Sequence, residues 1–142
     1  MSLAEIHAAI PHRAPFLFVD EIVERDEKRI VCRKTFRESD WFFGGHYPHY
    51  PITPGVLLCE AAMQAGAILL SRLEPSMAES VPVVARMNEV RFKRVVKPGE
   101  TIEMEVKLTD RVKNVYYLSA KVTCGGHVAV RFEFTCAMAP MA

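Results

Sequence analysis

The segment 56–70 is apolar on nearly every face, and this constrains the fold more than any other feature of the chain. Its sequence is VLLCEAAMQAGAILL, in which Glu60 is the only ionisable side chain apart from Cys59. A helix that is hydrophobic all round belongs inside a protein. Because a membrane-spanning helix needs about 20 apolar residues, we instead expect a helix over 55–73 that other elements of the same domain enclose.

Strand patterns lie on both sides of this helix. We expect strands over 16–24, 30–36, 83–95, 102–108, 116–122 and 128–134, and a loop rich in proline and aromatic residues over 38–54. The last three strands alternate apolar and polar residues, which is typical of a half-buried strand. Gly125-Gly126 indicates a tight hairpin turn. The pattern predicts one α+β domain over 1–142, in which a curved antiparallel sheet wraps around one long central helix.

The bulk composition excludes several classes of protein. The 142 residues carry a net charge of +1, which argues against a strongly charge-driven nucleic-acid or membrane partner but allows a local basic patch. Cys32, Cys59, Cys124 and Cys136 show neither a Cys-x-x-Cys pair nor metal-ligand spacing. Reduced, buried thiols and the lack of a recognisable signal peptide favour a cytoplasmic protein.

His46 and Glu60 are the candidate catalytic residues. His46 lies on the proline-rich loop, fourteen residues before Glu60. An imidazole can accept a proton at neutral pH, and a lone carboxylate in an apolar helix is costly unless it is paired, protonated or used. The pair therefore suggests general acid–base chemistry. The alternatives are a loop histidine with one hydrogen bond and a glutamate that pairs with an arginine across an interface; Arg86, Arg91 or Arg94 are candidates for that arginine.

Two further features accompany this pair. Gln64 lies one helical turn after Glu60 and is placed to orient its carboxyl group. The helix starts at Gly55-Val56 after Thr53-Pro54, and free N–H groups of a first turn suit an oxygen that gains negative charge. The alternative is an ordinary capped helix terminus, which every helix needs.

Other charged and histidine residues have weaker assignments. If the run 91–97 is a strand, Arg91, Lys93 and Val95 share one side; the run is then either a solvated strand edge or a surface for an acidic carrier or a phosphate. His46 and His49 lie three residues apart but lack a third ligand, so we expect no metal site. We assign the other histidines as surface or capping residues: His7, His12 and His127.

Several segments together resemble the FabZ-type (3R)-hydroxyacyl-acyl-carrier-protein dehydratases. The resemblance extends from about residue 10 to 135. The matching segments are PHRAPFLFVD (11–20), FFGGHYP (42–48), PGVL (54–57), Glu60-Ala61 with Gln64, RFKR (91–94) and PGE (98–100). The middle block, which contains His46 and Glu60, is the most specific of them.

The resemblance implies a hot-dog fold and a homodimer, often assembled as a trimer of dimers. It implies removal of water from a (3R)-3-hydroxyacyl thioester, in fatty acid biosynthesis or a related lipid pathway, with His46 of one subunit facing Glu60 of the other. The acyl chain would arrive on the phosphopantetheine arm of acyl carrier protein, and neither a metal nor an organic cofactor is expected.

Three groups of residues would support the catalytic pair on this reading. Backbone N–H groups at Gly55 and Val56 would hold the thioester oxygen, while Tyr47 and Gln64 would position the substrate. The carrier or its phosphopantetheine arm would meet the basic residues of the third block: Arg91, Lys93 and Arg94. Two alternatives remain on the same fold, an acyl thioesterase and a non-catalytic acyl-thioester-binding protein.

Overall fold

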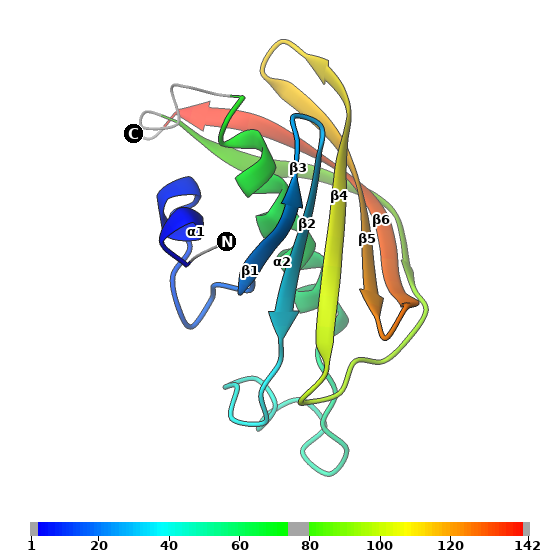
Figure 1. Cartoon of the computed structure of the whole chain (residues 1–142). Coiled ribbons are helices and arrows are strands. Elements are labelled where there is room, and N and C mark those ends of the chain that lie inside the picture. Colours follow the sequence, from blue (N-terminus) through cyan, green and yellow to red (C-terminus); the bar gives the residue numbers. More distant parts are fainter. Residues whose placement is uncertain (1–2, 74–79, 141–142) are drawn as a thin grey trace.

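The structure is a computed structural model that describes residues 3–73 and 80–140 of the chain. These residues form two helices, α1 (Leu3–Ala9) and α2 (Gly55–Leu70), and six strands. The strands are β1 (Glu21–Arg25), β2 (Arg29–Thr35), β3 (Ser80–Phe92), β4 (Thr101–Val112), β5 (Val115–Cys124) and β6 (His127–Pro140). They form one antiparallel sheet in the order β1-β2-β4-β5-β6-β3, which curves around α2 (Figure 1). The predicted fold class is confirmed.

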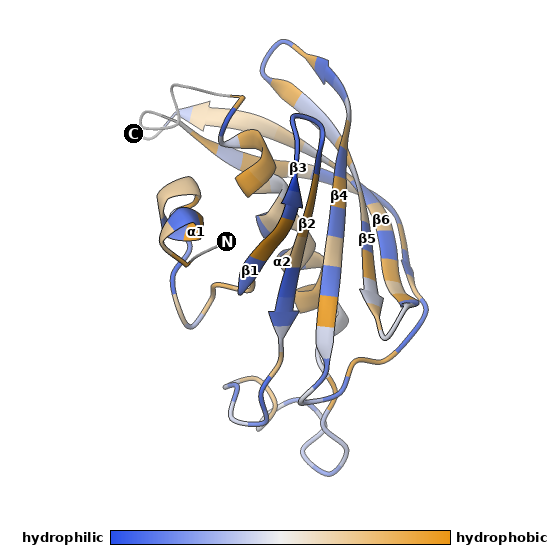
Figure 2. Cartoon of the chain, viewed as in Figure 1, coloured by the Kyte–Doolittle hydropathy of each residue, from blue (hydrophilic) through white to orange (hydrophobic). Residues whose placement is uncertain are grey.

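The core lies between α2 and the concave face of the sheet. Strand β4 alternates hydrophilic and hydrophobic residues (Figure 2), and Ile102, Met104 and Val106 point inward and are buried. Small residues on α2 let the sheet approach closely; a Cβ atom on Gly66 would lie 2.8 Å from Cζ of Phe134. Neither described helix has the length and apolarity needed to cross a lipid bilayer.

Helix α2 ends at Leu70, three residues earlier than predicted. The carbonyl oxygen of Ile68 accepts hydrogen bonds from the Arg25 guanidinium at 2.6 Å and from the Ser71 hydroxyl at 2.6 Å. The same carbonyl accepts from the backbone N–H of Ser71 at 3.2 Å, so the two side-chain donors reinforce the end of the helix. The positive charge of the guanidinium also interacts favourably with the negative, C-terminal end of the helix dipole.

Strand β1 is shorter than the strand predicted over 16–24, because the first part of that segment pairs with a side chain. The N–H of Phe18 donates to Oε1 of Gln64 at 2.7 Å, and the carbonyl oxygen of Phe16 accepts from Nε2 of Gln64 at 2.8 Å. The amide of Gln64 takes the place of a neighbouring strand. This segment is therefore extended and apolar, like a strand, without belonging to the sheet.

All four cysteines are buried and unpaired. Burial raises the pKa of Cys32 to about 12 and the pKa values of Cys59 and Cys136 to about 11. Because the thiolate is the reactive form, we expect almost no reaction of the native protein with a disulfide reagent at pH 8. Unfolding in guanidinium chloride should release all four thiols. Rapid labelling of the native chain would contradict this packing.

Candidate active site

The loop between β2 and α2 carries His46 and is anchored by aromatic side chains. It lies at the end of the sheet where β2 stops and α2 begins (Figure 1). Phe42 and Phe43 are buried, and the ring of Phe42 packs against Phe18 and Phe36 at centroid distances of 6.3 and 5.9 Å. This packing fixes the first half of a segment that has no regular secondary structure.

The imidazole of His46 is oriented by one backbone hydrogen bond. Its Nδ1 lies 2.9 Å from the carbonyl oxygen of Ile52. A carbonyl oxygen can only accept a hydrogen bond, so Nδ1 carries the proton and donates it. In the neutral ring, Nε2 then keeps its lone pair and can accept a proton from a substrate. The side chain is half-buried, which leaves the ring reachable.

Tyr47 lies directly beside this imidazole. The two rings meet edge to face with centroids 4.8 Å apart, and 56% of Tyr47 is exposed. Its φ of 54° lies in the left-handed region, which a bulky residue rarely adopts. The Tyr47 carbonyl accepts a hydrogen bond from the N–H of Tyr50 at 2.8 Å, which helps to hold this turn. The role of Tyr47 in positioning substrate stays a prediction.

Glu60 projects from the second turn of α2 and is oriented by Gln64. Nε2 of Gln64 donates to Oε2 of Glu60 at 3.0 Å. Gln64 is 1% exposed and is itself fixed by its two hydrogen bonds to the backbone of Phe16 and Phe18. The Glu60 side chain remains 24% exposed, so a single chain does not enclose it as fully as the sequence pattern predicted.

Sequence reasoning misses the role of His12, for which it predicts only a surface or capping position. Its Nε2 lies 3.9 Å from Oε2 of Glu60, and its side chain is 31% exposed. A signal was present in the sequence, since His12 belongs to the first block that resembles the FabZ-type enzymes. The sequence gives no spacing that links residue 12 to residue 60, and only the fold brings them together.

One chain places the two catalytic candidates in separate groups. His46 contacts Ile52 and Tyr47, whereas Glu60 contacts Gln64 and His12. No contact joins His46 to Glu60 within the described residues of the chain. That His46 and Glu60 act together stays a prediction.

The first turn of α2 offers free donors. The N–H groups of Leu57 and Leu58 both donate to the Pro54 carbonyl, at 2.9 and 3.4 Å. The N–H groups of Gly55 and Val56 have no acceptor among the residues that the structure describes. Both residues line a groove of about 510 Å³, together with Ile52, Thr53, Leu58 and residues 92–95. An oxygen that gains negative charge could be held at this position.

Gly55 is required for the shape of this groove. A Cβ atom there would lie 2.6 Å from Cε1 of Phe92. We expect Gly55→Ala to displace the Phe92 ring and the two free N–H groups. A displacement of about 1 Å in an active site can lower the rate about 10²-fold. If this groove binds substrate, kcat/KM should therefore fall about 10- to 100-fold. Gly44→Ala is the control, because nothing lies within 4 Å of that position. Equal turnover by both variants would contradict this role.

The basic run 91–97 does not lie on one face. Strand β3 ends at Phe92, and the N–H groups of Lys93 and Arg94 both turn to the Ala129 carbonyl, at 2.7 and 3.3 Å. Lys93 and Arg94 line the groove beside Gly55, whereas Arg91 lies in another groove and pairs with Glu89 at 3.2 Å. The expectation that Arg91 shares a side with Lys93 and Val95 is wrong because the strand ends between them.

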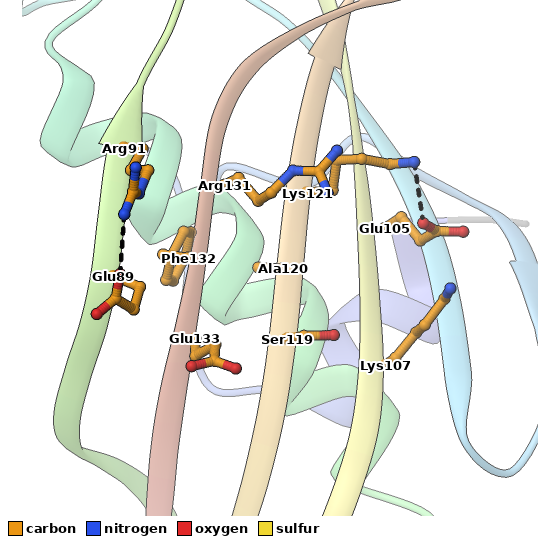
Figure 3. A pocket seen from close by; sticks show the side chains of 10 residues that line it. All are labelled: Glu89, Arg91, Glu105, Lys107, Ser119, Ala120, Lys121, Arg131, Phe132 and Glu133. Atoms are coloured by element: carbon orange, nitrogen blue, oxygen red, sulfur yellow. Dashed lines mark hydrogen bonds and ion pairs between the residues drawn. The ribbon is translucent and has the colours of Figure 1, made fainter.

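That other groove, of about 430 Å³, crosses strands β3, β4, β5 and β6 (Figure 3). On β4, β5 and β6 its charged side chains alternate with buried residues, so they project from the face of the sheet opposite α2. Glu105 pairs there with Lys121 at 3.5 Å. Neither His46 nor Glu60 reaches this groove, so it is not part of the candidate site.

Comparison with known proteins identifies the family. A family model described as a FabA-like domain matches residues 10–133. The curated 3-hydroxyacyl-acyl-carrier-protein dehydratase FabZ of Aromatoleum aromaticum is 39% identical, and the match covers 97% of each chain. The enzyme of the same name from Clostridium perfringens strain SM101 is 39% identical over 94% of this chain and 95% of its own length.

Solved structures agree on the fold. The dehydratase heterocomplex ApeI:P from Xenorhabdus doucetiae superposes with a TM-score of 0.77 at 14% identity, covering 94% of this chain and 90% of the other. At that identity the likeness shows the shared hot-dog fold alone. With the family match and the two relatives, the chain belongs to the FabA-like family, among relatives of the FabZ dehydratase type.

Proposed function

We propose that this protein removes water from a (3R)-3-hydroxyacyl thioester carried on acyl carrier protein and forms the trans-2-enoyl thioester. The observation that carries the proposal is the hydrogen bond from His46 Nδ1 to the Ile52 carbonyl, which leaves Nε2 as a base. A carboxyl group oriented by a buried amide and a helix terminus with two free donors supply the other parts. The named relatives are 3-hydroxyacyl-acyl-carrier-protein dehydratases. Chemically, such an elimination calls for a base, an acid and an oxyanion site.

The proposed reaction needs one base, one acid and one oxyanion site. Nε2 of His46 takes the C2 proton, and the N–H groups of Gly55 and Val56 stabilise the negative charge that builds on the thioester oxygen. The C3–O bond breaks as Glu60 gives its proton to the departing hydroxyl, and water leaves. Return of the proton from His46 to Glu60 restores both groups.

We infer a homodimer, because the two halves of the site lie apart within one chain. Strand β3 is an edge strand of the sheet. It exposes Val84, Met87, Val90 and Phe92 by 36 to 54%, and an exposed apolar edge strand favours pairing with another strand. Such pairing would let His46 of one subunit face Glu60 of the partner subunit.

The carrier would bind at the groove beside the start of α2. Lys93 and Arg94 line this groove with the free N–H groups of Gly55 and Val56. Cationic side chains there suit the phosphate of a phosphopantetheine arm and an acidic carrier surface. The placement favours these two residues over Arg91.

Four buried free thiols favour a cytoplasmic location.

The decisive assay is reversible hydration of a crotonyl thioester of acyl carrier protein. We expect the wild-type protein to form the 3-hydroxybutyryl thioester without releasing free thiol. Thiol release from a saturated acyl thioester would instead indicate a thioesterase. Binding without turnover of either substrate would indicate a non-catalytic acyl-thioester-binding protein.

Glu60→Gln should lower kcat of this reaction about 10²- to 10⁴-fold, since the amide cannot give a proton to the hydroxyl. The substitution keeps the size of the side chain and an oxygen that can accept from Gln64. Substrate binding, measured by KM, should change little. Wild-type turnover by this variant would exclude Glu60 as the acid.

A further inference from the structure

His12 lies against the carboxyl group of Glu60. Its Nε2 is 3.9 Å from Oε2 of Glu60. Its Nδ1 is buried and has no hydrogen-bond partner within the described part of the chain. Oε2 also accepts from Nε2 of Gln64 at 3.0 Å, whereas no described residue donates to Oε1. The two oxygens of this carboxyl group are thus treated differently by their surroundings.

The backbone around His12 is fixed by Arg13. The guanidinium of Arg13 donates to the carbonyl oxygens of Ile10 at 2.8 Å, His12 at 2.7 Å and His7 at 3.1 Å. These bonds hold the segment that follows α1 against itself. Farther along the same segment, Gln64 binds the backbone of Phe16 and Phe18. The His12 ring is therefore presented to Glu60 by a tethered segment rather than by a free loop.

The buried Nδ1 selects the tautomer of the neutral His12 ring. If Nδ1 carried the proton, its N–H group would be buried without an acceptor. If Nε2 carries the proton instead, Nδ1 buries only a lone pair, which costs less free energy. The proton therefore belongs on Nε2, the nitrogen that faces Oε2 of Glu60. The separation of 3.9 Å is longer than a hydrogen bond, but bonds at catalytic sites often start long and tighten when substrate binds.

We propose that His12 is a positioning residue for Glu60 in the dehydration reaction. The inference rests on the proposed function. His12 and Gln64 direct two N–H groups at Oε2, so that Oε1 is the oxygen that carries and delivers the proton. When the hydroxyl takes this proton, the negative charge left on Glu60 gathers on Oε2, where both donors stabilise it. His12 touches Glu60 and acts through it.

The test compares His12→Phe with His12→Gln. Phenylalanine fills the space of the imidazole ring but has no hydrogen-bond donor. We expect kcat to fall about 10-fold or more at unchanged KM, because one hydrogen bond to a charged group is lost. Glutamine keeps a donor N–H and should restore much of kcat. The same two substitutions at His127, which is exposed at the start of β6, are the matched controls.

A double-mutant cycle separates positioning from a structural effect. If His12 acts through Glu60, His12→Phe should cause no further loss in a Glu60→Gln background. An equal loss in both backgrounds, or wild-type kcat in His12→Phe, would overturn the inference. Turnover by the wild-type protein that Glu60→Gln lowers about 10²- to 10⁴-fold would show in the same experiment that the proposed function stands even if the role of His12 fails.

Discussion

His46→Ala is expected to lower kcat/KM for the dehydration about 10²- to 10⁴-fold, because it removes the base that takes the C2 proton. The fold should survive, since the imidazole is half-buried and makes one backbone hydrogen bond, to the Ile52 carbonyl. The measurement is hydration of the crotonyl thioester by wild type and variant at equal protein concentration. Unfolding in denaturant should show similar stability.

His49→Ala is the matched control, because His49 belongs to the same loop but is exposed. We expect it to keep turnover close to that of the wild type. Loss of activity in both variants would point to the loop rather than to the His46 imidazole. Full activity of His46→Ala would end the assignment of His46 as the base.

The tautomer of His46 can be observed without substrate. Nitrogen chemical shifts of the imidazole should show a protonated Nδ1 and an unprotonated Nε2 in the neutral ring, as the bond to the Ile52 carbonyl requires. The opposite tautomer would leave Nε2 without the lone pair that the proposed proton transfer needs.

Sequence reasoning predicted the fold well because its strongest signals were patterns of burial. The apolar segment 56–70 forms a buried helix, and the alternating strands pair as expected. Errors arose where side chains replace backbone partners. Gln64 substitutes for a strand beside Phe18, and Arg25 takes a carbonyl at the end of α2. Periodicity cannot reveal such long-range contacts between a side chain and the backbone.

The site was predictable in its parts but not in its connections. Local sequence identified His46 on a stiff loop and Gln64 one turn after Glu60, and the Gln64–Glu60 hydrogen bond is confirmed. The contact between His12 and Glu60 joins residues 48 positions apart. The separation of Arg91 from Lys93 depends on where β3 ends, and sequence patterns locate the end of a strand less reliably than its existence.

Gln64→Met is expected to destabilise the protein and to impair catalysis together. The substitution keeps a flexible side chain of similar size but removes all three hydrogen bonds of the amide. The buried N–H of Phe18 loses its acceptor, which costs about 1–3 kcal/mol of unfolding free energy. Glu60 loses the donor that orients Oε2, so kcat should fall about 10-fold, since a hydrogen bond to a charged group is worth about 1.5–3 kcal/mol.

Met63→Leu provides the control for this prediction, since Met63 neighbours Gln64 on α2 and is half-buried. Swaps of this kind between apolar residues of similar volume usually cost under about 1.5 kcal/mol. Urea unfolding and crotonyl thioester hydration should be measured on both variants. If Gln64→Met unfolds at the wild-type urea concentration, the amide does not hold the segment 16–18 against α2. If Gln64→Met is destabilised yet hydrates the substrate at the wild-type rate, Glu60 is oriented by other groups. The hydrogen bonds of Gln64 would then not link the stability of the segment 16–18 to catalysis.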